Sequence, residues 1–340
     1  MSRRLLHLTF ILLISWMTVS CEHKELCYHH SEHAYRYHIR LNADYRCVWE
    51  EQYTGPNWKA EWPAHYLPYE SFLPSLPTGL RVVNTSVDGR SDIHNLPAEG
   101  GVVNLYEGVN DILLYNNDTE YIPFSRENND ATTRATTRSR TRATYTSSKF
   151  ANEGEETVNA PDMLYANHID DYVPEKLLEP AEIDVTLHPL VFTYKIRYEF
   201  EAGLEYVSLA RGALTGMARS VLMNSGDTSA EPATILFDCE MTDFGSRAVV
   251  KSFGIPDFPN NHFGTRGTNK HALNLELMLR NGKTITFDFD VTDQVAKQPH
   301  GGVIVVKDIV VEKDDGVSGS GAFDVEVKDW GEYEDIYLPL

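Results

Sequence analysis

Hydrophobic and polar residues alternate along much of the second half of the chain. From Leu190 to Phe200, a large apolar side chain occupies every second position. Successive side chains of a β-strand point to opposite faces, so this pattern predicts a strand with one buried and one solvated face. The apolar run from Val303 to Val311 predicts a further strand.

The clearest local pattern predicts a β-hairpin over residues 273–291. Leucine recurs at every second position from Leu273 to Leu279, with Asn274 and Glu276 between. After Asn281-Gly282, apolar residues again alternate with threonine and aspartate as far as Val291. Asn-Gly accepts the positive φ angles of a type I′ turn, so we expect that turn here. The apolar residues should face the core, and Asn274 and Glu276 should face solvent.

The first half shows the same pattern more weakly. Alternation runs from Tyr37 to Asn42 and from Leu80 to Asn84, and glycines precede the apolar runs Val102–Tyr106 and Val109–Tyr115. Prolines between Glu50 and Thr78 exclude long helices there, and no segment sustains a 3.6-residue period. The chain is therefore expected to be all-β, with antiparallel sheets packed face to face.

A basic, polar stretch separates the two halves. Ala131 to Lys149 contains four arginines, many threonines and no acidic residue. Such a composition buries little apolar surface, which favours a flexible loop over an ordered element. We therefore expect an N-terminal sandwich over residues 21–130, a flexible linker over 131–160, and a C-terminal sandwich over 161–340.

The N-terminus has the order of a secretory signal peptide. Arg3 and Arg4 precede an apolar run from Leu5 to Met17, which is too short for a comfortable membrane span. Small residues then lead into Cys21, as in a lipobox, although Thr18 stands where leucine is usual. Residues 1–20 are predicted to be removed, and Cys21 to carry an acyl (palmitate-type) anchor. An ordinary signal peptide followed by a chance cysteine is the alternative.

Charge and cysteine content narrow the function classes. The net charge is −20, and removal of the two arginines with the signal peptide makes it −22. Such an acidic chain is not expected to bind nucleic acid or anionic lipid. Three cysteines remain after Cys21, an odd number that cannot form a closed disulfide framework. A disulfide between Cys27 and Cys47 is one alternative that the sequence allows.

Motifs of catalysis and cofactor binding are absent from the sequence, which contains no GxSxG, HExxH, GxGxxG or phosphate loop. We therefore expect no enzyme activity and no catalytic, cofactor or metal site. Two weaker candidates for a catalytic or calcium site are better explained by structural roles. Asp288 and Asp290 have the spacing of a glycosidase pair but suit a solvated strand face, and Asp314-Asp315-Gly316 suits a turn better than a calcium loop.

Two further candidate sites lie near the N-terminus. The first is a zinc site, for which the spacing of the residues is poor; these are Cys27, His29, His30, His33 and His38. The second is a set of three tryptophans that suits sugar stacking or packing on a sheet edge; these are Trp49, Trp58 and Trp62.

Several segments carry a family resemblance. The chain resembles the fimbrillin-associated anchor and tip-like lipoproteins of Bacteroidetes surface fimbriae. The matching segments are Lys24–Tyr28 with His30, Tyr115–Tyr121, Pro161–Leu164, Gly212–Ala218, Phe289–Val295 and Val325–Trp330. They extend over most of the mature chain, whereas residues 49–77 and the Arg/Thr stretch fit no pattern of the family.

The resemblance implies two tandem transthyretin-like β-sandwiches and a non-catalytic role as basal anchor or tip of a fimbria. It implies a surface-exposed position on the outer membrane through the lipid on Cys21. Fimbrial shaft or tip subunits are the implied partners, joined by addition of a β-strand to a sheet edge. A surface lipoprotein that binds glycans is the main alternative, and a hydrolase with an unrecognised site is a third.

Overall fold

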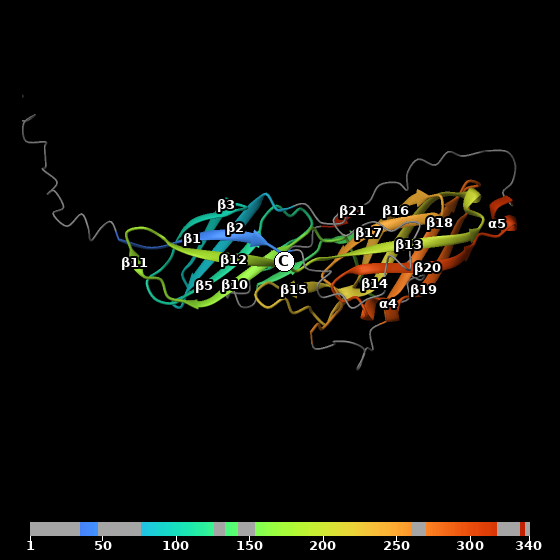
Figure 1. Ribbon diagram of the computed structural model, residues 1–340. Coiled ribbons are helices and arrows are strands. Elements are labelled where there is room, and N and C mark those ends of the chain that lie inside the picture. Colours follow the sequence, from blue (N-terminus) through green and yellow to red (C-terminus); the bar gives the residue numbers. More distant parts are fainter. Residues whose placement is uncertain are drawn as a thin grey trace, which may run out of the picture.

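The computed structural model describes residues 35–46, 76–125, 133–141, 154–259 and 270–317, and the backbone of 334–336. These residues form two β-sandwiches placed end to end (Figure 1). The predicted all-β class and the tandem arrangement of two sandwiches are confirmed.

The first sandwich is one curled sheet that closes into two layers. Its strands are β1 (Arg36–Tyr45), β2 (Gly79–Ser86), β3 (Ser91–Pro97), β4 (Gly100–Asn104), β5 (Asn110–Asn116), β10 (Tyr165–Tyr172), β11 (Lys176–Leu177) and β12 (Ala181–Pro189). Their order is β11-β1-β12-β10-β5-β2-β3, with β4 also on β1. Ile39 and Val185 from one layer pack against Val82, Ile112 and Leu114 from the other in a common core. Burial of this apolar surface stabilises the sandwich.

The second sandwich repeats this plan. Its main strands are β13 (Phe192–Ala202), β14 (Val207–Ala218), β16 (Pro232–Thr242), β17 (Gly245–Ser252), β18 (Ala272–Leu279), β19 (Thr284–Asp290) and β20 (Gly302–Val310). Their order is β19-β18-β14-β16-β17-β13-β20. Short helices, η4 (Leu204–Tyr206), α4 (Thr292–Ala296) and α5 (Lys313–Val317), lie between or after these strands. The largest hydrophobic core fills the space between the layers.

Short strands surround the junction between the sandwiches. β6 (Phe124–Ser125), β7 (Arg134–Thr136) and β15 (Ser220–Leu222) form a small sheet of their own. β8 (Ser139–Thr141), β9 (Glu156–Val158) and β21 (Glu334–Ile336) continue the second sheet from β16.

The expectation of purely antiparallel sheets is wrong in three places. β1 pairs in parallel with β12, β13 with β20, and β9 with β16. A parallel pair needs a long crossover between its strands, and alternation within a strand carries no information about such a distant partner.

The expected domain division is also wrong. β10 and β12 lie after residue 161, yet both belong to the first sheet. The chain reaches the second sheet in β8 and β9, returns to the first for β10 to β12, and enters the second sandwich again between Pro189 and Phe192. Residues 133–141 of the predicted linker form β7 and β8, with Ala135 and Thr137 buried. Pairing with distant strands orders this polar segment despite its composition. The rest of Ala131–Lys149 lies outside the described residues.

The predicted hairpin is confirmed, but its turn differs from the expected type. β18 and β19 pair with Leu273 opposite Phe289 and Leu277 opposite Ile285. The Gly282 N–H donates to the Leu279 carbonyl at 2.9 Å, and Gly282 has φ +81°. Asn281 is not among the residues with positive φ, which a type I′ turn requires at both central positions. The chain instead makes a three-residue loop with glycine in the left-handed position.

The predicted solvent-facing side of β18 is buried. Asn274 and Glu276 are both buried, as is Arg211 on β14, which lies directly across from Glu276. Each polar group has a partner: Asn274 Nδ2 donates to Asp288 Oδ1 at 2.7 Å, and Arg211 forms an ion pair with Glu276. The alternation of apolar and polar residues therefore predicted the strand β18 correctly. It did not show that the polar face of this strand is also buried.

Replacing Gly282 with valine should destabilise the second sandwich by about 1–3 kcal/mol, because a β-branched residue is strained at positive φ. No atom lies within 4 Å of the site of an added Cβ, so the cost is backbone strain and not a clash. The check is the midpoint of urea unfolding. Gly282→Asn is the control, since asparagine tolerates this conformation and should cost much less. Equal midpoints for Gly282→Val and the unmodified chain would contradict the strained turn.

Candidate functional site at the junction of the two sandwiches

Two of the family-like motifs meet at the junction. Asn116 ends β5, and its side chain accepts the N–H of Tyr165 at 2.7 Å and donates to the Met163 carbonyl at 3.0 Å. Asn116 also donates to Asp118 Oδ1 at 2.7 Å. The motif within Tyr115–Tyr121 is thus hydrogen-bonded to the motif Pro161–Leu164, although Asn116 and Met163 are 47 residues apart in sequence.

Two carboxylates complete this junction. Asp162 Oδ2 accepts the N–H groups of Glu120 and Tyr121 at 2.7 and 2.5 Å, and Asp118 Oδ2 accepts the Thr78 N–H at 2.8 Å. Burial alone would raise the pKa of Asp118, but the hydrogen bonds from Asn116 and Thr78 outweigh it and lower the pKa. These side chains hold loop backbone in place, which is a structural role.

Apolar side chains from both sandwiches pack together beside these motifs. Leu113 and Tyr115 of the first sandwich share a buried cluster with Val221 and Phe253 of the second, and Ala135 of β7 lies in the same cluster. Such burial opposes relative movement of the two sandwiches.

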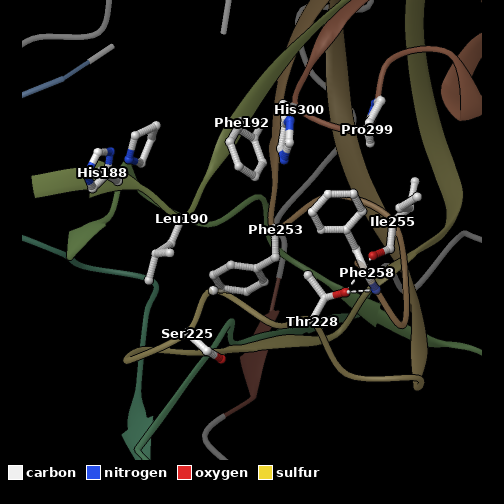
Figure 2. Close-up of a pocket in the computed structure, with 12 residues that line it drawn as sticks. His188, Leu190, Phe192, Ser225, Thr228, Phe253, Ile255, Phe258, Pro299 and His300 are labelled. Atoms are coloured by element: carbon white, nitrogen blue, oxygen red, sulfur yellow. Dashed lines mark hydrogen bonds between the residues drawn. The ribbon is translucent and has the colours of Figure 1, made fainter. Parts of the chain in front are cut away.

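A cavity of about 340 Å³ opens at this junction (Figure 2). Four separate segments line it: the connection from the end of β12 to the start of β13, the loop after β15, the chain after β17 and the loop before β20. The lining residues are His188, Pro189, Leu190, Phe192, Ser225, Gly226, Thr228, Phe253, Ile255, Phe258, Pro299 and His300.

The cavity wall is largely aromatic, with two imidazoles. The His300 ring lies 4.7 Å from the ring of Phe192 and 4.9 Å from that of Phe258, between centroids. Thr228 Oγ1 donates to the Ile255 carbonyl at 2.7 Å and accepts the Phe258 N–H at 2.8 Å, so this hydroxyl serves the wall itself (Figure 2). Pockets of this size and composition at a domain boundary suit a ring-shaped or apolar group. The described lining residues include no carboxylate.

Sequence reasoning missed this cavity. None of its residues belongs to a recognised motif, and they come from segments that only the folded chain brings together. The only signal in the sequence was the presence of phenylalanine and histidine in the same loops. That combination is too common to predict where a binding site lies.

Two further motifs occupy structural positions in the second sandwich, whereas Lys24–Tyr28 and Val325–Trp330 lie outside the described residues. Thr215 and Gly216 form a bulge in β14, where the Gly216 N–H donates to Glu155 Oε2 at 2.9 Å. In the Phe289–Val295 segment, Gln294 Nε2 donates to the Val305 carbonyl and Gln294 Oε1 accepts the Val305 N–H, both at 2.9 Å. Gln298 Oε1 accepts the Val303 N–H at 2.7 Å.

The carboxylates considered as catalytic or calcium-binding also have structural contacts. Asp288 bonds to Asn274, and Asp290 accepts the Thr292 N–H at 2.9 Å; hydrogen bonds from Thr292 lower the pKa of Asp290. Both lie on exposed positions of β19, as the solvated-face reading predicts. Asp315 lies in α5, where a turn was expected, and forms an ion pair with Lys283 of the β18–β19 hairpin.

Several predicted residues lie outside the described part of the chain. These are the lipidation site Cys21, the cysteines Cys27 and Cys47, the tryptophans Trp49, Trp58 and Trp62, and the histidines His29, His30 and His33. His38 is buried on β1, and Cys239 on β16 forms no disulfide with another described residue. Across the described residues, no helix has the length and apolar character needed to span a membrane.

The fold places this chain in the class of tandem β-sandwich proteins. A crystal structure of a "putative adhesin" from Bacteroides ovatus aligns with a TM-score of 0.57 and 21% identity, over 82% of this chain and 93% of that one. Residues 71–238 match a family described as a domain of unknown function, DUF5119.

The relative with an assigned role is the "Putative fimbrium anchoring subunit Fim4B" of Bacteroides ovatus. It is 24% identical over 302 residues, which cover 81% of this chain and 88% of that protein. A solved fimbrial anchor protein, Mfa2 of Porphyromonas gingivalis, also aligns, with 11% identity, 79% and 90% coverage, and a TM-score of 0.39. The relationship to fimbrial anchor-like proteins that the motifs indicated is confirmed by the first of these two proteins.

Proposed function

We propose that this chain is a structural, non-catalytic component of a cell-surface fimbria, held at the outer membrane through acylated Cys21. The relation to a fimbrium anchoring subunit over most of both chains carries the proposal. The apolar cluster at the junction supports it, because residues of both sandwiches share this cluster and it joins them into one extended body suited to bear load along its length.

The N-terminal sequence supports membrane attachment through lipid. Cys21 stands directly after a signal-peptide pattern, as the acylated cysteine of a lipoprotein does. Acyl chains contribute about 0.8 kcal/mol per buried methylene, so the several chains of a bacterial lipoprotein hold it firmly. Other fimbrial subunits would join by adding a strand to an open sheet edge, where backbone N–H and C=O groups await partners.

The basal anchor is favoured over the tip. A lipid at one end fixes that end to the membrane, which suits the first subunit of a fibre. Glycan binding is the second candidate function, and the aromatic cavity at the junction is the observation that favours it, since sugar rings stack on aromatic faces.

A strain that carries Cys21→Ala should produce a protein without fatty-acid label, and its fibres should appear in the medium instead of on cells. Metabolic labelling and electron microscopy of cells and medium are the measurements. Cys239→Ala is the matched control, because it makes the same substitution at a cysteine of the second sandwich, far along the chain from the signal-peptide pattern, and should leave labelling and attachment unchanged.

The results of this experiment distinguish a basal anchor from a tip subunit and from a glycan-binding protein. Persistent label in Cys21→Ala would refute the lipid assignment. Loss of label with fibres still attached would favour the tip over the anchor. Normal fibres in a strain that lacks the whole protein would refute a structural role and place glycan binding first.

A further inference from the structure

Three metal-ligating side chains converge on the outer face of the first sandwich. Asp111 lies on β5, and His168 and Asp170 lie on β10. One carboxylate oxygen from each aspartate and one ring nitrogen of His168 all lie within 4.8 Å of one another. This cluster is separate from the cavity and from the motif contacts at the junction.

Strand register explains why these residues meet. His168 pairs with Leu113 and Ile169 with Ile112, after which an extra residue in β10 forms a bulge. Asp170 and Asp171 therefore both lie across from Asp111, and the Asp171 N–H donates to Asp111 Oδ1 at 3.2 Å. His168 and Asp170 are two residues apart, so they point to the same face.

Two observations favour the binding of a cation by this cluster. The Nε2 atom of His168 is shielded from solvent and has no hydrogen-bond partner within the described residues. Separately, the carboxylates of Asp111 and Asp170 face each other across two paired strands, where like charges repel. A cation would give the imidazole a partner and neutralise the carboxylates.

We propose that Asp111, His168 and Asp170 bind a divalent transition-metal ion, with zinc the best match to the donor set. Imidazole nitrogen suits zinc, whereas calcium and magnesium prefer oxygen ligands alone. Zinc bonds to nitrogen and carboxylate oxygen are about 2.0–2.2 Å long, so ligand atoms around one ion lie at most about 4.4 Å apart. The ligand atoms lie within 4.8 Å of one another, so binding would require them to approach slightly, and the exposed side chain of Asp170 leaves room for a solvent ligand.

The ion would join β5 to β10 at the end opposite to Asn116 and Tyr165. The bonds of Asn116 already fix these strands at the junction. The metal site would fix them a second time, which makes the stability of the first sandwich depend on metal concentration.

The test is isothermal titration of the full-length mature chain with zinc, together with thermal melting at increasing zinc. His168→Gln should remove one bound zinc per chain or weaken it by at least about 10-fold, and it should abolish the zinc-dependent rise in melting temperature. Asp111→Asn should do the same. His94→Gln is the matched control, because His94 is a half-buried histidine of the same sandwich that lies near a single carboxylate, Asp92.

Counting bound ions separates this site from any other zinc ligands in the chain. Zinc bound in equal number and with equal affinity by the unmodified chain and His168→Gln would overturn the proposal, as would the absence of any zinc binding. Calcium or magnesium bound in preference, with no effect of His168→Gln, would overturn it too. Circular dichroism without metal verifies that each variant is folded.

Discussion

Replacing Arg211 with methionine is expected to lower the free energy of unfolding of the second sandwich by about 3–5 kcal/mol. The side chains of Arg211 and Glu276 are 1% and 7% exposed, and they form an ion pair across β14 and β18. Removing the guanidinium leaves the Glu276 carboxylate buried without its counter-charge, and the desolvation of that charge is no longer offset. Urea denaturation with fluorescence detection measures the loss.

Two comparisons make this result specific. Arg211→Met combined with Glu276→Leu should recover much of the stability, because no buried charge remains. Arg247→Met removes one partner of an exposed pair, whose side chains are 49% and 64% exposed, and should change the unfolding midpoint little. A single Arg211→Met variant as stable as the unmodified chain would show that the pair contributes nothing.

Acidification should destabilise the second sandwich through His271. Burial lowers the pKa of His271 from 6.5 to about 4, an effect only partly opposed by a hydrogen bond involving Thr215 and the charge of Asp290. The unfolded chain therefore takes up a proton near pH 6.5, whereas the folded chain does so only near pH 4. Stability is present in full above about pH 6.5 and is lost as the pH falls toward 4, by about 3 kcal/mol in all.

The measurement is the free energy of unfolding between pH 4 and 7.5 for the unmodified chain and for His271→Asn. Carboxylates titrate in both proteins, so only the difference between the two profiles reports on His271. The variant should lose less stability on acidification than the unmodified chain. Parallel profiles would mean that His271 is protonated in the folded state as readily as in the unfolded one.

Period-two alternation predicted the strands because it reports a local property, the two faces of a strand. It identified 190–200 and the 273–291 hairpin, whose observed register places Leu273 and Leu275 opposite Phe289 and Phe287. It did not predict the parallel partners of β1 and β13, because those lie far away in sequence. For the same reason, Ala135 and Thr137 gave no sign of burial: the strands that cover the Arg/Thr stretch lie elsewhere in the chain.

The candidate sites show the same limit. The motifs marked the segments around Asn116 and Asp162, but not their contact. The cavity around His300 and the cluster around His168 are assembled from residues that have no common spacing in sequence. Chemistry that depends on register, such as Asp111 facing Asp170, requires the paired strands to be known first.

The side-chain amides of Gln294 and Gln298 have a consequence for assembly. Gln294 presents to Val305 the same donor and acceptor that the backbone of a neighbouring strand would present, and Gln298 occupies the Val303 N–H. These groups lie on the side of β20 that faces away from β13. An incoming chain would have to displace both glutamines before it could extend the sheet at β20. The two glutamines thus block this edge of the sheet against the addition of a further strand.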